Sequence, residues 1–516
     1  MAPTSSRSIR TIVSTVVATC FAAQIASGAD AEEQRSRPNI VLMIADDLGY
    51  GDLGCYGAKK ILTPNIDRLA AEGLRATDAH SIAAVCTPSR YSILTGRYYS
   101  RYGRNWVGEC LIERDRPTMA SVLRDDGYTT GYFGKWHLGW GEHNDREQRA
   151  DIEWNTTLPA GVLECGFDTY FGTPFSHNEA PFVFVRDRQV VGLETGDPLV
   201  IPPKSEDRGA WGWGTSKGAE NAHKMRPQDR IDLIVTKEAQ DWIRQQTEAN
   251  PFFLHLSFVA PHVPVAPAAE FLAPGGGKYE AFIRQMDWCV GEVLKTLEER
   301  GMLENTLVIF TSDNGAVMHE NVIKQGHFSN GTLLGQKTDA WEGGHRVPFI
   351  VRWPGHVPAG AVTDNLISQS DIAATVFEAA GINPPKSSFE DSISQLAVLQ
   401  DPETRSARHE MYIVGIGGTV LRSGDWLFIP KQGSLGKTTA EKDPWSPISA
   451  QGRTNSDYDE NNQLKPDAPG TQLYNLSKDL SQTTNVVREH PEKAAELAAR
   501  YDVVVKEIRT SPKTQR

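Results

Sequence analysis

Short, fully apolar runs alternate along this chain with stretches in which apolar residues recur every three or four positions. The runs at residues 40–45, 128–133 and 252–259 predict buried strands, and so does NTLVIFTS, which precedes Asp313. Between them, residues 279–300 place apolar side chains on one face and stop at Gly301, which predicts an amphipathic helix. Strands that alternate with helices indicate a sheet covered by helices on both faces.

The pattern changes after about residue 385. Polar loops come first, then the short alternating runs EMYIVGI, GTVLRSG and DWLFIPK, and finally a helical pattern at residues 491–508. We therefore predict the α/β class: a large, mostly parallel but mixed sheet flanked by helices at residues 36–385. A smaller domain of antiparallel sheet plus helix is expected at residues 386–516.

The first residues carry an export signal. Arg7 and Arg10 precede an apolar run that ends in small residues suited to cleavage, so residues 1–31 are predicted to be a secretion signal peptide. That run is too short and too polar to anchor the chain, and we expect an exported protein, periplasmic, secreted or lumenal, without stable membrane insertion. The 53 Lys and Arg against 65 Asp and Glu give a net charge of −12, which argues against nucleic acid as a partner.

Polar residues follow directly after the predicted strands. Because the carboxyl ends of neighbouring parallel strands meet at one edge of a sheet, these residues are expected to share one site. They are Asp46, Asp47, Lys135, His137, His262, Asp313 and Asn314. The carboxylates and the amide are hard oxygen donors, which suit calcium or magnesium, with calcium the first choice. Lys135, His137 and His262, with Arg90 and Lys337, supply cations and proton donors for an oxyanion beside the metal.

Cys86 stands in AAVCTPSR, just before a predicted helix. By itself it is a small buried hydrophobe or half of a disulfide. Five cysteines remain after the signal, without C-x-x-C spacing, so zinc-ribbon and thioredoxin motifs are excluded. An odd count in an exported protein leaves at least one thiol unpaired or altered, and Cys86 is a candidate.

Several motifs together resemble the type I, formylglycine-dependent sulfatases of the alkaline phosphatase superfamily. The most specific is Cys86-Thr-Pro-Ser-Arg90 followed by LTGR, and the others are NIVLMIADDLGYGD, GKWHLG, TSDNG, WEGGHRVP and QLYNLSKDLSQTTN. The resemblance covers nearly the whole mature chain and lies closest to arylsulfatases and N-acetylgalactosamine-6-sulfatases. It implies that Cys86 is oxidised to formylglycine (3-oxoalanine) by a formylglycine-generating enzyme, and that the hydrated aldehyde is the nucleophile.

The resemblance also assigns roles to single residues. Asp46, Asp47, Asp313, Asn314 and the modified Cys86 would bind one Ca²⁺, Arg90 would steady the hydrated aldehyde, and Lys135 and Lys337 would hold the sulfate. His262, with Lys337, would protonate the departing alcohol, and His137 would take a proton from the second hydroxyl to expel sulfate. The segment GTPFSHNEA adds Ser176 and His177 as substrate-binding residues.

The implied function is hydrolysis of a sulfate ester, with a sulfated carbohydrate expected as substrate by analogy. Two alternatives belong to other classes. A phosphate or phosphonate monoester hydrolase could use the same cradle, although its dianionic substrate favours more metal charge than one ion supplies. A catalytically inactive protein that binds sulfated glycans would have no need of Cys86.

Overall fold

The computed structural model describes residues 37–102, 112–141, 152–194, 196–202, 215–436, 438, 448 and 452–510. The predicted signal peptide at residues 1–31 therefore lies outside the described residues, and its export role stays a prediction. In the described part, no helix combines the length and the apolar character needed to cross a membrane.

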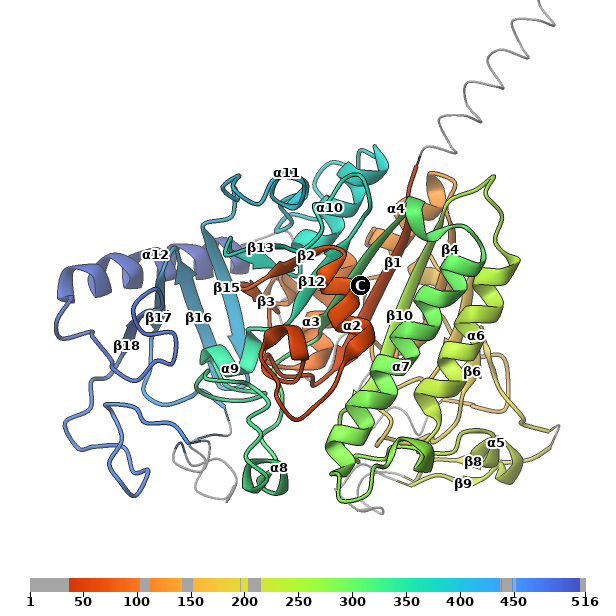
Figure 1. The fold of residues 1–516 in the computed structure, drawn as a ribbon, viewed down its shortest axis with the longest axis horizontal. Helices are drawn as coiled ribbons and strands as arrows, with labels where there is room; N and C mark the ends of the chain where they lie inside the picture. The colour runs from red at the N-terminus through yellow and green to blue at the C-terminus, as the bar shows by residue number, and fades with distance from the viewer. Residues whose placement is uncertain are drawn as a thin grey trace, which may run out of the picture.

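A ten-stranded sheet forms the centre of the molecule (Figure 1). Its order is β13-β2-β12-β11-β1-β10-β4-β5-β6-β7. The strands β11, β1, β10, β4 and β5 run parallel, whereas β12, β6 and β7 pair antiparallel with their neighbours. The bounds are β13 Ala361–Thr363, β2 Leu74–Ala76, β12 Phe349–Arg352, β11 Thr306–Ser312, β1 Asn39–Asp46, β10 Phe252–Pro261, β4 Thr129–Gly134, β5 Thr169–Gly172, β6 Val185–Arg186 and β7 Gln189–Val190. The predicted mixed, mostly parallel sheet is confirmed.

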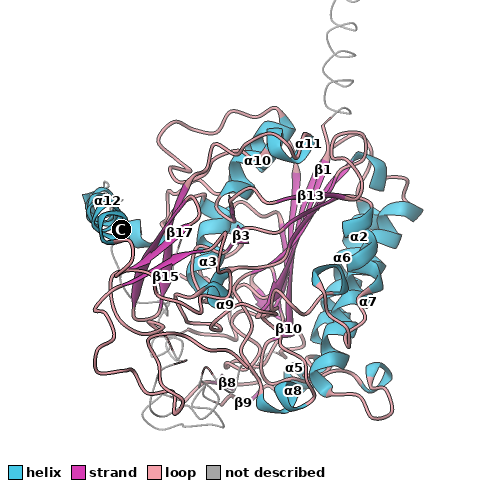
Figure 2. Ribbon diagram, turned by 60° about the vertical axis from the view of Figure 1, so that its left-hand side comes forward, coloured by secondary structure: helices cyan, strands magenta, loops and turns pink. Residues whose placement is uncertain are grey.

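Helices cover both faces of this sheet, as predicted (Figure 2). One face packs against α2 (Pro64–Ala71), α6 (Ile231–Gln245) and α7 (Lys278–Glu299). The other packs against α3 (Cys86–Thr95), α4 (Met119–Asp125), α10 (Asp371–Ala380) and α11 (Leu396–Gln400). Because β1 is buried on both faces, its side chains enter the two cores alternately, Leu42 into the second and Met43 into the first.

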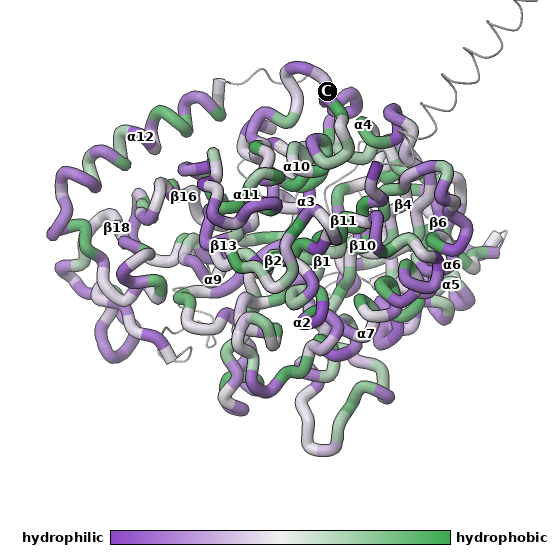
Figure 3. Tube along the Cα trace, turned by 45° about the horizontal axis from the view of Figure 1, so that its top comes forward, coloured by the Kyte–Doolittle hydropathy of each residue, from purple (hydrophilic) through white to green (hydrophobic). Residues whose placement is uncertain are grey.

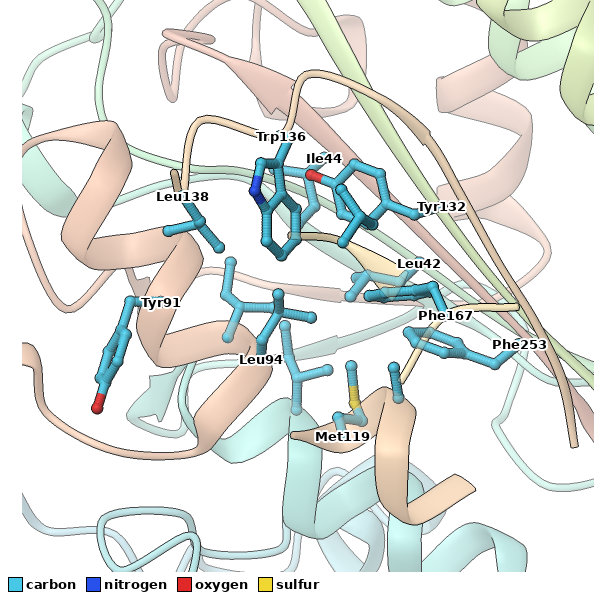
Figure 4. Close-up of a cluster of buried hydrophobic side chains, with 14 of the residues drawn as sticks. Leu42, Ile44, Tyr91, Leu94, Met119, Tyr132, Trp136, Leu138, Phe167 and Phe253 are labelled. Atoms are coloured by element: carbon cyan, nitrogen blue, oxygen red, sulfur yellow. The ribbon is translucent and has the colours of Figure 1, made fainter. Parts of the chain in front are cut away.

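Aromatic side chains fill the core beneath α3 and α4 (Figure 4). Tyr132 of β4 meets Trp136 edge to face with ring centroids 5.3 Å apart, and it contacts Phe167 in the same way at 5.2 Å. Aromatic pairs of this geometry add to the stabilisation from burial. This packing supports the loop after β4, which carries Lys135 and His137.

The C-terminal part forms a second, four-stranded antiparallel sheet, as predicted. Its strands are β15 (Glu410–Gly415), β16 (Gly418–Ser423), β17 (Trp426–Ile429) and β18 (Gln472–Asn475), and α12 (Pro491–Thr510) packs on one face. Hydrophobic and hydrophilic positions alternate along α12, as expected for a helix with one face on a sheet (Figure 3). The division at residues 385 and 386 stays a prediction.

Short elements complete the description. They are β3 (Ala79–His80) paired with β14 (Ile367–Ser368), β8 (Leu199–Val200) paired with β9 (Lys217–Gly218), α5 (Glu220–Met225), α8 (Glu320–Lys324), α9 (Glu342–His345), and the 3₁₀ helices Gly54–Tyr56, Tyr99–Tyr102, Leu163–Cys165, Ala269–Phe271 and Leu303–Asn305.

Candidate active site

The polar residues predicted to share one edge of the sheet do lie together there. Strands β11, β1, β10 and β4 are consecutive neighbours in the sheet. Asp46 ends β1, and the other residues follow the carboxyl ends of the strands beside it: Asp47 after β1, Asp313 and Asn314 after β11, His262 after β10, and Lys135 and His137 after β4. The topology thus explains why residues far apart in sequence meet.

Three buried carboxylates and three cations form the centre of the site. Lys135 Nζ lies 2.6 Å from Asp46 Oδ2, and Lys337 Nζ lies 2.6 Å from Asp47 Oδ1. Arg90 donates to Asp313 Oδ2 from Nε at 3.0 Å and from Nη2 at 2.6 Å. Buried charges of this number are tolerated only when they are paired, and here each carboxylate has a cation beside it.

The pairing governs ionisation. Burial acts to raise the pKa of Asp46, but Lys135 and the other nearby cations hold it well below the ordinary value. Burial also acts to raise the pKa of Asp47, but Lys337 lowers it more, and the pKa lies below its ordinary value. At Asp313, burial and the charges of Asp46 and Asp47 raise the pKa more than Arg90 lowers it, and the pKa is about 6. Of the three carboxylates, Asp313 is therefore the one most easily protonated, and a nearby positive charge would lower its pKa.

Cys86 begins α3, so its side chain sits where the backbone N–H groups and the helix dipole favour negative charge. Its Sγ lies 3.5 Å from His137 Nδ1. Burial raises the pKa of the thiol in spite of Lys135 and Lys337 nearby. On the other side of the His137 ring, Nε2 lies 3.6 Å from a carboxylate oxygen of Glu179, which is buried.

The two remaining histidines share one backbone acceptor. His262 Nδ1 and His177 Nε2 lie 2.6 and 2.7 Å from the carbonyl oxygen of Val263, so each of these nitrogens carries a proton. The other nitrogen of His262, Nε2, therefore faces Asp47 Oδ2, at 3.7 Å. Burial lowers the pKa of His262 and, more strongly, that of His177.

The backbone is strained at two of these positions. Asp47 and His137 adopt left-handed conformations with φ of 63° and 56°, which non-glycine residues rarely do. Such strain persists where the surroundings impose it, and it is concentrated at functional sites. Here it turns each side chain into the cluster.

The donor set fits a hard divalent cation. Asp46 Oδ1 and Asn314 Oδ1 are buried and have no hydrogen-bond partner in the part of the chain that the structure describes, whereas Asn314 Nδ2 donates to Asp47 Oδ1 at 2.8 Å. Oxygen atoms left unpaired beside ionised carboxylates are what Ca²⁺ or Mg²⁺ would coordinate. Asp46, Asp47, Asp313 and Asn314 could thus hold the predicted ion.

A second buried group with the composition of a metal site lies elsewhere. His80, Glu342 and His345 bring ligand atoms within 4.8 Å of one another. Arg346 Nη1 pairs with Glu342 at 2.9 Å, and Arg422 Nη1 lies 3.9 Å from the same carboxylate. With two guanidinium groups against its only carboxylate, this group is an ion-pair network and a poor host for a cation.

The contacts of Arg90 and Ser176 add to the roles that the sequence predicts for them. The hydrogen bonds of Arg90 to described residues go to Asp313, to Ser257 Oγ and to the carbonyl of Lys135, and none goes to Cys86. Arg90 therefore positions two members of the cluster rather than Cys86 alone. Ser176 Oγ is buried without a hydrogen-bond partner in the segment that carries His177.

Sequence reasoning missed Ser257, Glu179 and the Val263 carbonyl. Ser257 and His255 are the two polar residues in the run PFFLHLSFVAP, and a polar residue inside a buried strand was the available signal for Ser257. Glu179 follows the singled-out His177 by two positions. A backbone carbonyl leaves no sequence signal.

Comparison with known proteins identifies the family of the chain. The sulfatase family model matches residues 38–382. An N-acetylgalactosamine-6-O-sulfatase from Bacteroides thetaiotaomicron is 33% identical over 508 residues, covering 91% of this chain and 93% of the relative. The dog N-acetylgalactosamine-6-sulfatase is 34% identical over an alignment that covers 72% of this chain and 68% of the relative. A solved structure from work on glycosaminoglycan metabolism by Bacteroides thetaiotaomicron has 31% identity and a TM-score of 0.78, covering 91% of this chain and all of that one.

Proposed function

The chain belongs to the sulfatase family and is a sulfuric ester hydrolase, and we propose that it removes sulfate from a carbohydrate by means of a formylglycine made from Cys86 and one calcium ion. The observation that carries this proposal is the position of Cys86. It begins a buried helix, 3.5 Å from His137, beside the cluster of three carboxylates and three cations. The carbohydrate substrate is inferred from relatives named for sulfated N-acetylgalactosamine.

The calcium ion would be held by Asp46, Asp47, Asp313, Asn314 and the modified residue 86. The two unpaired oxygens, Asp46 Oδ1 and Asn314 Oδ1, support this assignment. When bound, the ion supplies positive charge that makes a hydroxyl at residue 86 more acidic and offsets the charge of the sulfate.

Formylglycine supplies, as its hydrate, one hydroxyl that can act as nucleophile and a second that allows sulfate to leave again. His137 Nδ1 is the nitrogen directed at residue 86, so it accepts the proton of that second hydroxyl. The carboxylate of Glu179 on the other side of the ring stabilises the positive charge that His137 then carries.

Lys135 and Lys337 bind the sulfate oxygens, and both are already held near the site by Asp46 and Asp47. His262 donates its Nδ1 proton to Val263, which leaves Nε2 to act on the substrate side. With Lys337, the doubly protonated form of His262, which the carboxylates of Asp46 and Asp47 favour, would deliver its Nε2 proton to the alcohol that departs. Arg90 keeps Asp313 and the loop of Lys135 in place.

Substrate comparison tests the reaction. The same aryl alcohol is offered as sulfate and as phosphate at saturating calcium, beside a panel of defined sulfated mono- and oligosaccharides. We expect a higher kcat/KM for the sulfate, because the site has ligands for one metal ion only, and sulfate release from at least one saccharide. A higher kcat/KM for the phosphate contradicts the assignment and favours the phosphate or phosphonate alternative. Binding of sulfated glycans without any release favours the inactive binder.

Peptide mass spectrometry tests the modification. Trypsin releases residues 76–90, which contain Cys86. In active protein this peptide lacks one sulfur and two hydrogens, gains one oxygen and reacts with hydrazides, and the modified fraction follows specific activity. Protein made without a formylglycine-generating enzyme is the control. Fully active protein with an alkylatable Cys86 contradicts the proposal.

Export belongs to the same proposal. Residues 1–31 direct the chain out of the cytoplasm, and the formylglycine-generating enzyme is its maturation partner. N-terminal sequencing of the mature protein from the periplasm, the medium or a lumenal compartment tests the cleavage.

A further inference from the structure

Arg226, which follows α5, differs from the other buried arginines in the described part of the chain. It is 4% exposed, yet no carboxylate lies within ion-pair distance among the described residues. Each of the others pairs with at least one acid: Arg90 with Asp313, Arg97 with Glu113, Arg346 with Glu342, Arg352 with Glu72, Arg408 with Asp371 and Arg422 with Asp78. A buried cation normally has a counter-ion, and this one lacks it.

The contacts of Arg226 are to neutral groups. Its Nη2 donates to the carbonyl oxygen of His177 at 2.6 Å, and its Nη1 donates to Gln228 Oε1 at 3.0 Å. The guanidinium carbon lies 5.6 Å from the ring centroid of Phe182. Burial therefore acts on the charge without compensation and lowers the pKa of Arg226 to about 9.

Further polar atoms are unpaired in the two segments that the hydrogen bond from Arg226 to the His177 carbonyl joins. Five buried side-chain atoms in residues 176–178 and 226–228 have no hydrogen-bond partner among the residues that the structure describes: Ser176 Oγ, His177 Nδ1, Asn178 Oδ1, Arg226 Nε and Gln228 Nε2. Each such atom costs about 1–3 kcal/mol. These atoms belong to two segments joined by one hydrogen bond, and buried polar atoms of this kind call for a further partner, which a bound molecule could supply.

This group adjoins the catalytic cluster through His177. The ring of His177 lies edge-on to that of His262 with centroids 5.5 Å apart, and both histidines donate to the Val263 carbonyl. His262 acts on the departing alcohol in the proposed reaction. A ligand at Arg226 would therefore belong to the sugar side of the sulfate ester.

We propose that Arg226 binds a second anionic group of the substrate, a carboxylate or a further sulfate on the same or the adjoining sugar. The proposal rests on the proposed function and names its substrate class: glycans that carry at least two anionic groups. Arginine suits such a group because its N–H donors match the spacing of two anion oxygens. Nε is free to donate, and the unpaired amide and hydroxyl groups beside it can bind neighbouring sugar hydroxyls.

The test is a cycle of substrates and variants. The substrates are one sulfated disaccharide with a uronic acid, the same disaccharide with that carboxyl reduced to an alcohol, and the reduced form with a second sulfate. In the wild type, kcat/KM is expected to be about 10- to 100-fold higher for the doubly charged substrates, the usual gain from a charge-assisted hydrogen bond. The form preferred, carboxylate or second sulfate, identifies the source of the anion.

Arg226→Gln removes the charge but keeps a donor for the His177 carbonyl, and in it the ratio between charged and reduced substrates should fall to about 1. Arg226→Lys keeps the charge and should restore part of the ratio. Arg186→Gln is the matched control: Arg186 also lies over an aromatic ring, 4.7 Å from Phe171, but it pairs with Glu238 on the surface, and the ratio should stay at the wild-type value.

An equal loss of kcat/KM on charged and reduced substrates in Arg226→Gln would overturn the proposal, because Arg226 would then only hold the His177 segment. Calorimetric binding of the unsulfated uronate disaccharide tests the same point without turnover. About tenfold weaker binding to Arg226→Gln than to the wild type is expected, and equal or undetectable binding to both proteins overturns the proposal. If no saccharide releases sulfate but this difference is measured, the proposed reaction fails and the anion site stands.

Discussion

Replacing Asp313 should separate its two tasks, which are to hold Arg90 and, in the proposed function, to bind calcium. Asp313 accepts three buried hydrogen bonds, from Arg90 Nε at 3.0 Å, from Arg90 Nη2 at 2.6 Å and from the backbone N–H of Asp47 at 3.2 Å. Asp313→Ala removes all three and leaves a guanidinium that is 2% exposed without its main counter-ion. Loss of one partner from a buried pair costs about 3–5 kcal/mol. Asp46 Oδ1, 3.7 Å from Arg90 Nη2, keeps part of the compensation, so we expect the lower end of that range.

Asp313→Asn is the milder variant. Its amide oxygen can still accept from Arg90, but its amide nitrogen then faces the N–H of Asp47, which loses its acceptor. An unsatisfied buried donor costs about 1–3 kcal/mol. This variant should fold, with a lower free energy of unfolding, and should still lack the carboxylate that the metal requires.

Denaturant unfolding with a chelator, and then with increasing calcium, measures both effects. An ion that binds only the folded state adds about 2.7 kcal/mol at a concentration 100 times its Kd. The wild type should gain this increment, and Asp313→Asn should gain much less at the same calcium concentration. Asp371→Asn is the control, because Asp371 accepts from the buried Arg408 in the same way but belongs to another part of the core. Asp371→Asn should have a lower free energy of unfolding than the wild type but should gain the same amount when calcium is added. A full calcium increment in Asp313→Asn would refute the assignment of Asp313 as a ligand.

Two further predictions concern a glycine and a pH dependence. In Gly315→Ala the new Cβ would lie 1.9 Å from the carbonyl oxygen of Gly343, so the turn after Asn314 must move. Activity should fall, and the free energy of unfolding should drop by about 1–3 kcal/mol. Gly470→Ala is the control, because its Cβ would point into open space, and it should change neither quantity. Asp232 accepts from the N–H groups of Val259 and Ala260, and burial raises its pKa to about 7. The folded state therefore keeps a proton that the unfolded state releases near pH 4, so this contribution to stability is complete below about pH 4 and declines as pH rises towards 7. Unfolding free energies from pH 5 to 8 should fall for the wild type relative to Asp232→Asn; parallel curves would contradict the raised pKa.

The fold could be predicted because its central strands stand out in the sequence as short apolar segments. β1, β10 and β11 are buried on both faces, so they are mostly apolar in sequence, and polar residues stand at the carboxyl end of each, where the backbone leaves the sheet. Adjacent parallel strands bring those polar residues to one edge, and this is why Asp46, Asp313 and His262 could be grouped without a structure.

The pairing of the charges could not be predicted in the same way. That Lys135 faces Asp46 while Lys337 faces Asp47 depends on loop conformations, including the left-handed backbone of Asp47. The Val263 carbonyl that fixes the proton positions of His262 and His177 belongs to the backbone, which every residue shares. The role proposed for Arg226 could not be predicted for another reason. Among the described residues no acid lies near it, and the sequence does not show which side chains become neighbours in the folded chain.

The small C-terminal sheet takes part in building the site, although it supplies none of the proposed catalytic residues. The N–H of Ala84, two positions before Cys86, donates to the carbonyl of Val414 in β15, and the N–H of Val414 donates to the carbonyl of Ile82. The carbonyl of Ala84 in turn accepts from the N–H of Thr338, the residue after Lys337. The segment that leads to Cys86 and the loop that carries Lys337 are thus bonded to each other and to β15. Because these backbone bonds help to set the distance between residue 86 and Lys337, the lysine proposed to bind sulfate, the proposed catalytic geometry depends on β15 as well as on the large sheet.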